Sequence, residues 1–462
     1  MSDNRPTLAR DLGVWAAIAI VVGTVIGSGV FLVPKTMISR VGSPEMVFAV
    51  WVAGGLLSLF GALTYAELAA ALPEAGGEYV YLSAAYGPFW GFLYGWAQMW
   101  VAKSASIATL ATGFFYYLAN FRPELDQVVA VIPGNLGPGG GPLEIRSGQI
   151  LAMVVIVLLA WLNYYGVKIG GGVQVAITAV KVAAILAIVV VGLGSGVGKA
   201  ANFSAALPAS GGFSGFFAAL VAALWAYDGW NNVSMVSSEI RRPSRNLPIA
   251  LIGGILLVIV IYLLTNLAYF YVLSPAEVAG SDRVAAEMMR HILGSSGAGA
   301  VSLAAMISIF AALNGSILSG SRVPYAMARD GLFFRKVAFV HPIYRTPGVS
   351  ILAVSGWAAL LVLSGRYEQL YTLVVFASWI LYAMTAASVI VLRRKRPELA
   401  RPYRVIGYPV VPLLFVLVAT VLLGSTFVES PRESLLGLGL TVAGIPFYFY
   451  WKRRIPASDA RA

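Results

Sequence analysis

Two apolar segments of this chain contain residues that weaken a helix near their middles. The first carries Gly27-Ser28-Gly29, and the second carries Asp228-Gly229 within residues 225–231. In hydrocarbon an unpaired backbone N–H or C=O is costly, so interrupted helices persist at membrane depth only where they line a cavity. The pair of breaks therefore predicts a polar binding site halfway across a membrane.

The first break has the chemistry to bind a zwitterion. Gly27 and Gly29 permit a positive φ and the close approach of a ligand. Unwinding there leaves free N–H groups at the start of the second half-helix, where the helix dipole favours a carboxylate. The carbonyls that end the first half-helix can accept from an ammonium. Packing of a glycine face against a neighbouring helix is the alternative interpretation, and the second break argues against it.

The second break offers an aromatic ring and a carboxylate. Trp225 lies well inside the segment, which favours a gate over a ligand rather than an interface anchor. Asp228 is an intramembrane acid, and such residues are functional by default. It is expected to attract a cationic side chain or to order the broken backbone as a cap. Gly229 supplies the relaxed backbone.

Lys181 lies in the middle of another apolar segment. An ammonium at that depth must face the bundle interior and meet carbonyls, carboxylates or water. It could replace a bound cation, although structural pairing alone is the alternative. Lys103 is placed similarly, but no motif gives it a role.

Other polar residues carry weaker signals. We expect cytoplasmic gate or packing contacts from Glu67, Glu239, Arg322, Arg329 and Asp330. The two histidines match no metal spacing, and no catalytic motif is present. The sequence therefore predicts no metal, no cofactor and no enzymatic activity.

The composition requires a membrane to position these residues. Of 462 residues, 59% are hydrophobic and 11% are charged, and the mean hydropathy is +0.81. Soluble domains carry about 25% charged residues, so the chain is predicted to be an all-α integral membrane protein in the cytoplasmic membrane. About twelve spans are expected, at residues 14–40, 44–71, 88–120, 149–167, 170–196, 213–238, 247–274, 298–328, 347–364, 369–392, 408–427 and 434–451.

The net charge of +12 follows membrane topology rather than nucleic-acid binding. Basic residues cluster in alternate loops, which the positive-inside rule assigns to the cytoplasm together with both termini. The clusters are Arg5 and Arg10; Arg241, Arg242 and Arg245; Arg335, Lys336 and Arg345; Arg393, Arg394, Lys395, Arg396, Arg401 and Arg404; and Lys452, Arg453 and Arg454.

The positions of the breaks predict one transmembrane domain, residues 1–462, built from an inverted repeat. Residues 14–196 form the first half and residues 213–392 the second, because an odd number of spans per half inverts the second. Residues 408–451 add two helices. Residues 72–82 are amphipathic and too short to span, so we expect them to lie along the cytoplasmic surface. Residues 133–142 should only connect two spans.

Several motifs resemble those of the L-type amino acid transporters, a branch of the amino acid–polyamine–organocation superfamily. The resemblance extends over most of the chain. It lies in residues 22–31 (VGTVIGSGVF), 65–68 (YAEL) with 76–79 (GGEY), 225–231 (WAYDGWN) with 245–248 (RNLP), 313–316 (LNGS) with 321–322 (SR), and 396–399 (RPEL) with 401–402 (RP).

The resemblance implies a LeuT-type 5+5 inverted-repeat fold and exchange of amino acids without sodium. By carry-over, the substrate carboxylate and amine are held by Ile26, Gly27, Ser28 and Gly29 with Ala226, and Trp225 is the aromatic gate. Lys181 matches the lysine that stands in for a sodium ion, with Ser308 or Ser316 as its partner on the helix over residues 298–328. Asp228 resembles the acid of members that accept cationic amino acids, but carriers of small neutral ones can also have it.

The leading hypothesis is a sodium-independent exchanger of L-amino acids, with neutral ones as the expected substrates. The alternatives are a proton-coupled amino acid or polyamine symporter and, from another class, a membrane receptor that binds an amino acid without carrying it. The chain has no cysteine, which rules out the disulfide that joins animal members of the family to a heavy chain. Two consecutive acids follow the second broken helix in many relatives, whereas this chain has Ser238-Glu239.

Overall fold

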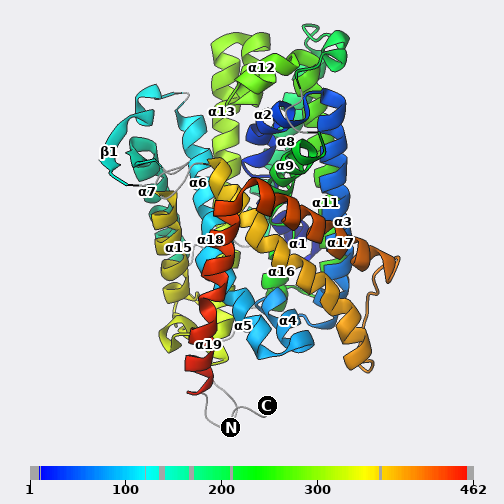
Figure 1. Cartoon of the computed structure of the whole chain (residues 1–462), viewed down its shortest axis with the longest axis vertical. Coiled ribbons are helices and arrows are strands. Elements are labelled where there is room, and N and C mark those ends of the chain that lie inside the picture. Colours follow the sequence, from blue (N-terminus) through cyan, green and yellow to red (C-terminus); the bar gives the residue numbers. More distant parts are fainter. Residues whose placement is uncertain are drawn as a thin grey trace.

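The computed structural model describes residues 10, 12–119, 121–134, 141–165, 171–208, 212–363 and 367–454, with the backbone alone at 171–174. Arg5 and parts of five predicted segments (residues 120, 135–140, 166–167, 170 and 364) lie outside this set. Figure 1 shows long helices running along the vertical axis, with α12 (Pro275–Gly280) at the upper end and α4 (Glu78–Tyr86) and α19 (Gly444–Lys452) at the lower end. These two ends are called the α12 end and the α4 end below.

The remaining elements follow in chain order. They are α1 (Val14–Val25), α2 (Gly29–Val41), α3 (Pro44–Ala71), α5 (Pro88–Ala97), the π-helical turn η1 (Gln98–Ala102), α6 (Lys103–Leu118), η2 (Pro123–Asp126), β1 (Val128–Ile132), β2 (Leu143–Arg146), α7 (Ser147–Tyr164), α8 (Gly171–Gly194), η4 (Ala200–Ser204), α9 (Gly212–Ala226), α10 (Asn232–Met235), η5 (Ser237–Glu239), α11 (Pro243–Val272), α13 (Val284–Gly320), α14 (Arg322–Arg329), η6 (Arg335–Ala338), α15 (Gly348–Val362), α16 (Tyr367–Lys395), α17 (Val410–Glu429) and α18 (Pro431–Val442).

Local sequence explains where the helices begin and end. α3 starts with Pro44 after Ser43, whose hydroxyl accepts from the Met46 N–H; this is the arrangement that satisfies a first-turn donor. α2 ends at Gly42, which takes a positive φ of 78° that glycine adopts without a steric penalty.

The chain is a multi-pass membrane protein. Among the described residues, eight helices are long and apolar enough to cross a membrane, and nine if α1 and α2 form one bent span. α9 and α15 are shorter apolar helices, and η1 divides the run from α5 to α6. Helical structure thus lies over each of the twelve predicted spans where the structure describes them. Only eight or nine of the helices meet the length and hydropathy requirements for crossing a membrane.

Both predicted breaks interrupt their helices. α1 and α2 meet at an angle of 41° across residues 26–28. α9 ends at Ala226 and α10 begins at Asn232, with Gly229 between them at a φ of 100°. A residue with a Cβ is strained at that φ, which explains the glycine.

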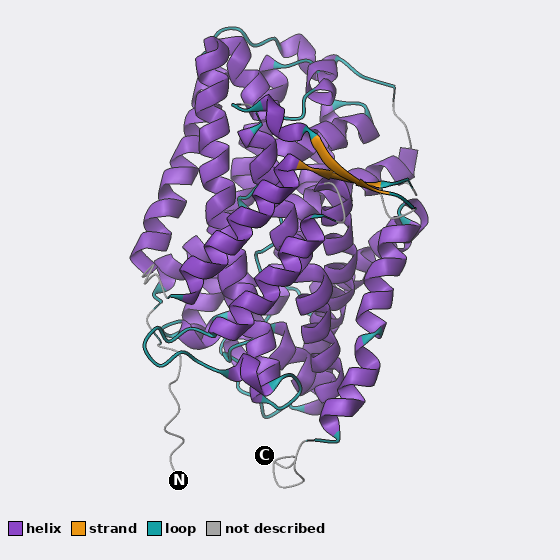
Figure 2. Ribbon diagram, turned by 90° about the vertical axis from the view of Figure 1, so that its left-hand side faces the viewer, coloured by secondary structure: helices purple, strands orange, loops and turns teal. Residues whose placement is uncertain are grey.

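The bundle is mostly helical, with one antiparallel pair of strands, β1 and β2, on its side (Figure 2). One expectation was wrong. Residues 72–82 do not lie along the surface: Gly76 and Gly77 turn the chain with positive φ values, and α4 begins at the completely buried Glu78. The polar face of this segment meets the second break rather than water.

The two broken helices touch at Gly29. A Cβ built there would lie 2.4 Å from Ala226 Cα and 2.5 Å from Ala226 Cβ. Any larger residue would push α2 away from α9, so the glycine is required for the half-helices to meet.

We therefore expect Gly29→Ala to lower stability by about 1–3 kcal/mol through overpacking. Thermal unfolding of the purified protein measures this effect. Gly253→Ala is the matched control, since nothing lies within 4 Å of its Cβ position. Equal behaviour of the two variants would contradict the close contact.

Candidate functional site

The backbone groups freed by the breaks are paired with side chains from other helices. Lys181 Nζ, from α8, donates to Gly23 O and Ile26 O at 2.7 Å each and lies 3.4 Å from Ser308 O on α13. Ser308 Oγ donates to Ile26 O at 3.2 Å. Lys181 is therefore bound to the end of α1, and Ser308 rather than Ser316 is its neighbour on α13.

Two hydroxyls join the first break to the second. Tyr262 OH, from α11, lies 3.0 Å from Val25 O and 2.8 Å from Ala226 O, within hydrogen-bonding distance of both acceptors. Thr24 Oγ1 lies 2.9 Å from Gly229 O. The geometry of each break is thus fixed partly by the other.

A small cavity lies between the two breaks. The cavity is lined by Thr24, Val25, Gly27, Ser28, Gly29, Ser106, Leu110, Trp225, Asp228, Gly229 and Ser316.

The predicted site residues divide into two groups. Gly27, Ser28, Gly29, Trp225, Asp228 and Gly229 line the cavity. The other three are Ile26, Lys181 and Ala226, which are not among the lining residues. Ile26 is completely buried, and its carbonyl accepts from Lys181, whereas Ala226 packs on Gly29. Sequence reasoning missed Ser106 and Leu110 on α6, because small or apolar residues in a helix look alike whether they face a ligand or a neighbour.

The cavity contains donors and acceptors suited to a zwitterion. α2 begins at Gly29, and Phe31 N donates to Ser28 O at 3.2 Å. The N–H groups of Gly29 and Val30 are those that a first turn leaves without a partner inside the helix. Ser28 also brings its hydroxyl to this wall. Asp228 is half-buried, and its Oδ1 accepts from Tyr382 OH at 2.9 Å.

Aromatic side chains close the cavity toward the α12 end. Trp225 Nε1 donates to Tyr367 OH at 2.8 Å, and Tyr367 OH donates to Ser28 Oγ at 2.9 Å. Trp225 also stacks on Tyr371, with ring centroids 6.2 Å apart. Tyr367 lies just before the segment predicted from residue 369, so the sequence did not single it out.

Buried polar contacts close the opposite side. Glu78 accepts from Asn231 Nδ2 and, at 2.9 Å, from Tyr94 OH. Burial raises the pKa of the Glu78 carboxyl above its ordinary value of 4.5. These contacts hold α4 against the segment that links α9 to α10.

The acids and arginines expected near a gate lie toward the α4 end. Arg322 Nε is 3.5 Å from Glu239 Oε1, and Tyr79 OH donates to Asp330 Oδ2 at 2.6 Å. Burial raises the pKa of Asp330. Arg329 lies against the ring of Tyr325, 5.9 Å from its centroid.

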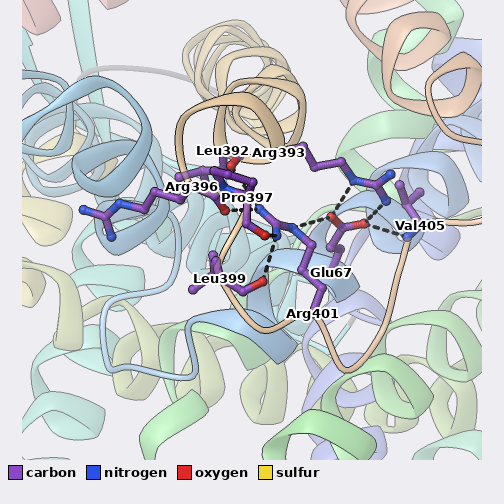
Figure 3. Close-up of polar contacts among 8 residues, drawn as sticks. All are labelled: Glu67, Leu392, Arg393, Arg396, Pro397, Leu399, Arg401 and Val405. Carbon is purple, nitrogen blue, oxygen red and sulfur yellow. Dashed lines mark hydrogen bonds and ion pairs between the residues drawn. The ribbon is translucent and has the colours of Figure 1, made fainter.

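Glu67, at the lower end of α3, holds the segment that joins α16 to α17 (Figure 3). Arg393 donates to both carboxylate oxygens, at 2.9 and 2.6 Å, and Val405 N donates at 2.7 Å. Arg401 Nε lies 3.5 Å from the same carboxylate. Bidentate arginine–carboxylate pairs have fixed geometry, so this cluster is a packing contact between α3 and α16.

The sequence matches a family model described as amino acid permease over residues 12–446. The chain belongs to the amino acid permease family. The permease is therefore an amino acid transporter and not an enzyme, and the resemblance to L-type amino acid transporters is confirmed.

Curated relatives match over nearly their whole length. The serine/threonine exchanger SteT of Bacillus subtilis is 33% identical, with 97% of this chain and 98% of the relative covered. The b(0,+)-type amino acid transporter 1 of Homo sapiens is 32% identical over 96% of this chain and 88% of the relative. The Asc-type amino acid transporter 1 of Mus musculus is 30% identical over 98% and 84%.

Removal of the Lys181 ammonium should disable the permease. Lys181→Met removes a donor from two buried carbonyls: Ile26 O keeps Ser308 Oγ, whereas Gly23 O loses its side-chain partner. An unsatisfied buried group costs about 1–3 kcal/mol. We expect uptake by proteoliposomes to fall at least about tenfold, since 1.4 kcal/mol corresponds to tenfold. The exposed Lys336 provides a control in Lys336→Met. Wild-type uptake in Lys181→Met would contradict the role of the ammonium.

Glu78 should make stability depend on pH. The folded state holds its proton above pH 4.5, where the unfolded state releases it, so stability falls as pH rises from 4.5 through the raised pKa. Glu78→Gln removes this loss, and we expect its melting temperature to change less than that of the wild type over this interval. The exposed Glu398 gives the control variant Glu398→Gln. Parallel melting profiles of wild type and Glu78→Gln would contradict the prediction.

Proposed function

We propose that this permease is a sodium-independent exchanger of L-amino acids, mainly neutral ones, that works by alternating access. The observation that carries the proposal is the position of Lys181 Nζ among Gly23 O, Ile26 O and Ser308. A fixed cation occupies the oxygen-rich place beside the broken helix.

Sodium independence follows from the chemistry of that place. Hard cations bind clusters of backbone and hydroxyl oxygens, and transporters use the carbonyls of unwound helices for coupling ions. Here the Lys181 side chain donates to the oxygens at the end of α1 in place of such an ion. A dissolved cation at the same oxygens would be repelled by Lys181.

The proposed substrate position uses both breaks. The α-carboxylate would accept from the N–H groups of the first turn of α2 and from the Ser28 hydroxyl, near the positive end of the helix dipole. The ammonium would face the carbonyls that end α1 and α9. Trp225 would cover the substrate, and Asp228 would face its side chain.

Side-chain contacts on both sides of the cavity support alternating access. The aromatic layer of Trp225, Tyr367 and Tyr371 lies toward the α12 end, and the Glu78 contacts lie toward the α4 end. Exchange requires that the empty carrier reorient slowly, so that each outward movement of one substrate permits the inward movement of another. The name of SteT describes an exchanger of serine and threonine.

The proposal includes the topology predicted from sequence. Twelve spans would form two inverted repeats, residues 14–196 and 213–392, followed by residues 408–451, in a LeuT-type fold. The lower ends of α16 and α19, which carry basic clusters, lie near α4 in Figure 1. This asymmetry supports a cytoplasmic α4 end and cytoplasmic termini.

Proteoliposomes test the proposal directly. Labelled serine or alanine should enter vesicles preloaded with unlabelled amino acid at least about tenfold faster than empty vesicles, with the same rate when choline replaces sodium. Uptake that ignores the internal pool would contradict exchange. Accumulation in empty vesicles driven by an imposed pH gradient would instead indicate a proton-coupled symporter, which the half-buried Asp228 and the buried Glu78 make the second candidate. Binding without flux would indicate a receptor.

A further inference from the structure

Lys103 occupies an unusual position in the bundle. It is the first residue of α6 and follows the π-helical turn η1, whose sequence contains neither glycine nor proline. Single π-helical turns are rare and are frequent at functional sites, because the extra residue re-aims the side chains that follow. The Lys103 side chain is buried, with 5% of its surface exposed.

The surroundings of Lys103 are shaped to its length. A Cβ at Gly320 of α13 would lie 2.3 Å from Lys103 Cγ and 2.9 Å from Cδ, so the aliphatic stem crosses α13 at a glycine. At the far end of the stem, Nζ donates to Asn232 Oδ1 at 2.7 Å. Asn232 begins α10, the half-helix that follows the second break.

Two carboxyl groups lie beside the segment that Lys103 contacts through Asn232. Tyr382 OH lies 2.9 Å from Asp228 Oδ1 and 3.4 Å from Asn231 Oδ1. Asn231 Nδ2 in turn donates to Glu78. Both acids are therefore placed to interact electrostatically with Lys103. Asp228 lines the cavity, whereas Glu78 belongs to the contacts on the α4 side. Lys103 itself is not among the residues that line the cavity. Lys181 is bound to the carbonyls of α1 and Ser308, on the other side of the first break.

We propose that Lys103 is a buried counter-charge that determines which substrate side chains the permease accepts. Its ammonium offsets the negative charge that Asp228 presents to the cavity and thereby limits the attraction of the site for cationic side chains. The inference rests on the proposed function, since it requires that the cavity bind amino acids. Lys103 acts through Asp228 and does not touch the substrate.

The mechanism is electrostatic and follows from burial. Charges in a dry interior interact much more strongly than in water and are screened little by salt. Without the ammonium, Asp228 would face the cavity uncompensated, and a substrate with a second ammonium or a guanidinium would supply the missing positive charge. A neutral substrate would gain nothing from the same change.

Lys103→Gln tests the charge separately from the hydrogen bond, because the glutamine amide can still donate toward Asn232. The measured quantity is the ratio of inhibition constants for arginine and alanine against uptake of labelled serine. We expect Lys103→Gln to shift this ratio at least about tenfold in favour of arginine. Asp228→Asn should shift it in the opposite direction, and the double variant should return it toward the wild-type value.

A purely structural role would weaken both inhibitors alike, so an unchanged ratio in Lys103→Gln would overturn the inference. If Lys103→Gln does not fold, recovery of folded protein in the Lys103→Gln, Asp228→Asn double variant supports the charge pairing, and failure of both contradicts it. Measurements on the wild type distinguish a failure of this inference from a failure of the proposed function. If no amino acid competes with serine uptake or shifts the melting temperature of the wild type, the proposed function fails first.

Discussion

The need to pair backbone groups inside hydrocarbon determines most of this structure. Breaking a helix at membrane depth frees carbonyl and N–H groups that water cannot reach, and each must find a partner within the protein. Lys181, Ser308, Tyr262 and Thr24 supply the partners for the carbonyls beside the two breaks. The bundle around the breaks is therefore organised by four polar side chains that reach from α1, α8, α11 and α13. The cavity is the space that these contacts leave open.

This constraint also separates two kinds of residue that the sequence presents together. Ile26 and Ala226 belong to the breaks, but their carbonyls bind Lys181 and Tyr262 and their side chains lie away from the cavity. Their role is to hold the shape of the break. Gly27, Ser28 and Gly229 line the cavity, with backbone and hydroxyl groups near the site where a ligand would bind.

The sequence predicted the breaks because glycine and aspartate in apolar runs are conspicuous. It also predicted that Lys181 must face inward, since no other direction is tolerable for an ammonium at that depth. It could not predict the partners contributed by distant segments, such as Tyr262, Tyr367 and Tyr382, because tyrosines in a membrane helix give no local signal of what they bind. The error over residues 72–82 has a related cause. An amphipathic pattern shows that one face is polar, but it does not tell whether that face meets water or, as at Glu78, buried amides and hydroxyls.

The Tyr262 hydroxyl has a mechanical consequence. It has a single hydrogen and two carbonyl acceptors within reach, one at the end of α1 and one at the end of α9. Full alignment with one acceptor weakens the bond to the other, so the ends of the two half-helices share one donor. A movement of one half-helix away from Tyr262 would let the hydroxyl align fully with the carbonyl of the other. Movement of both at once would leave the hydroxyl without either acceptor, so this contact favours movement of one half-helix at a time.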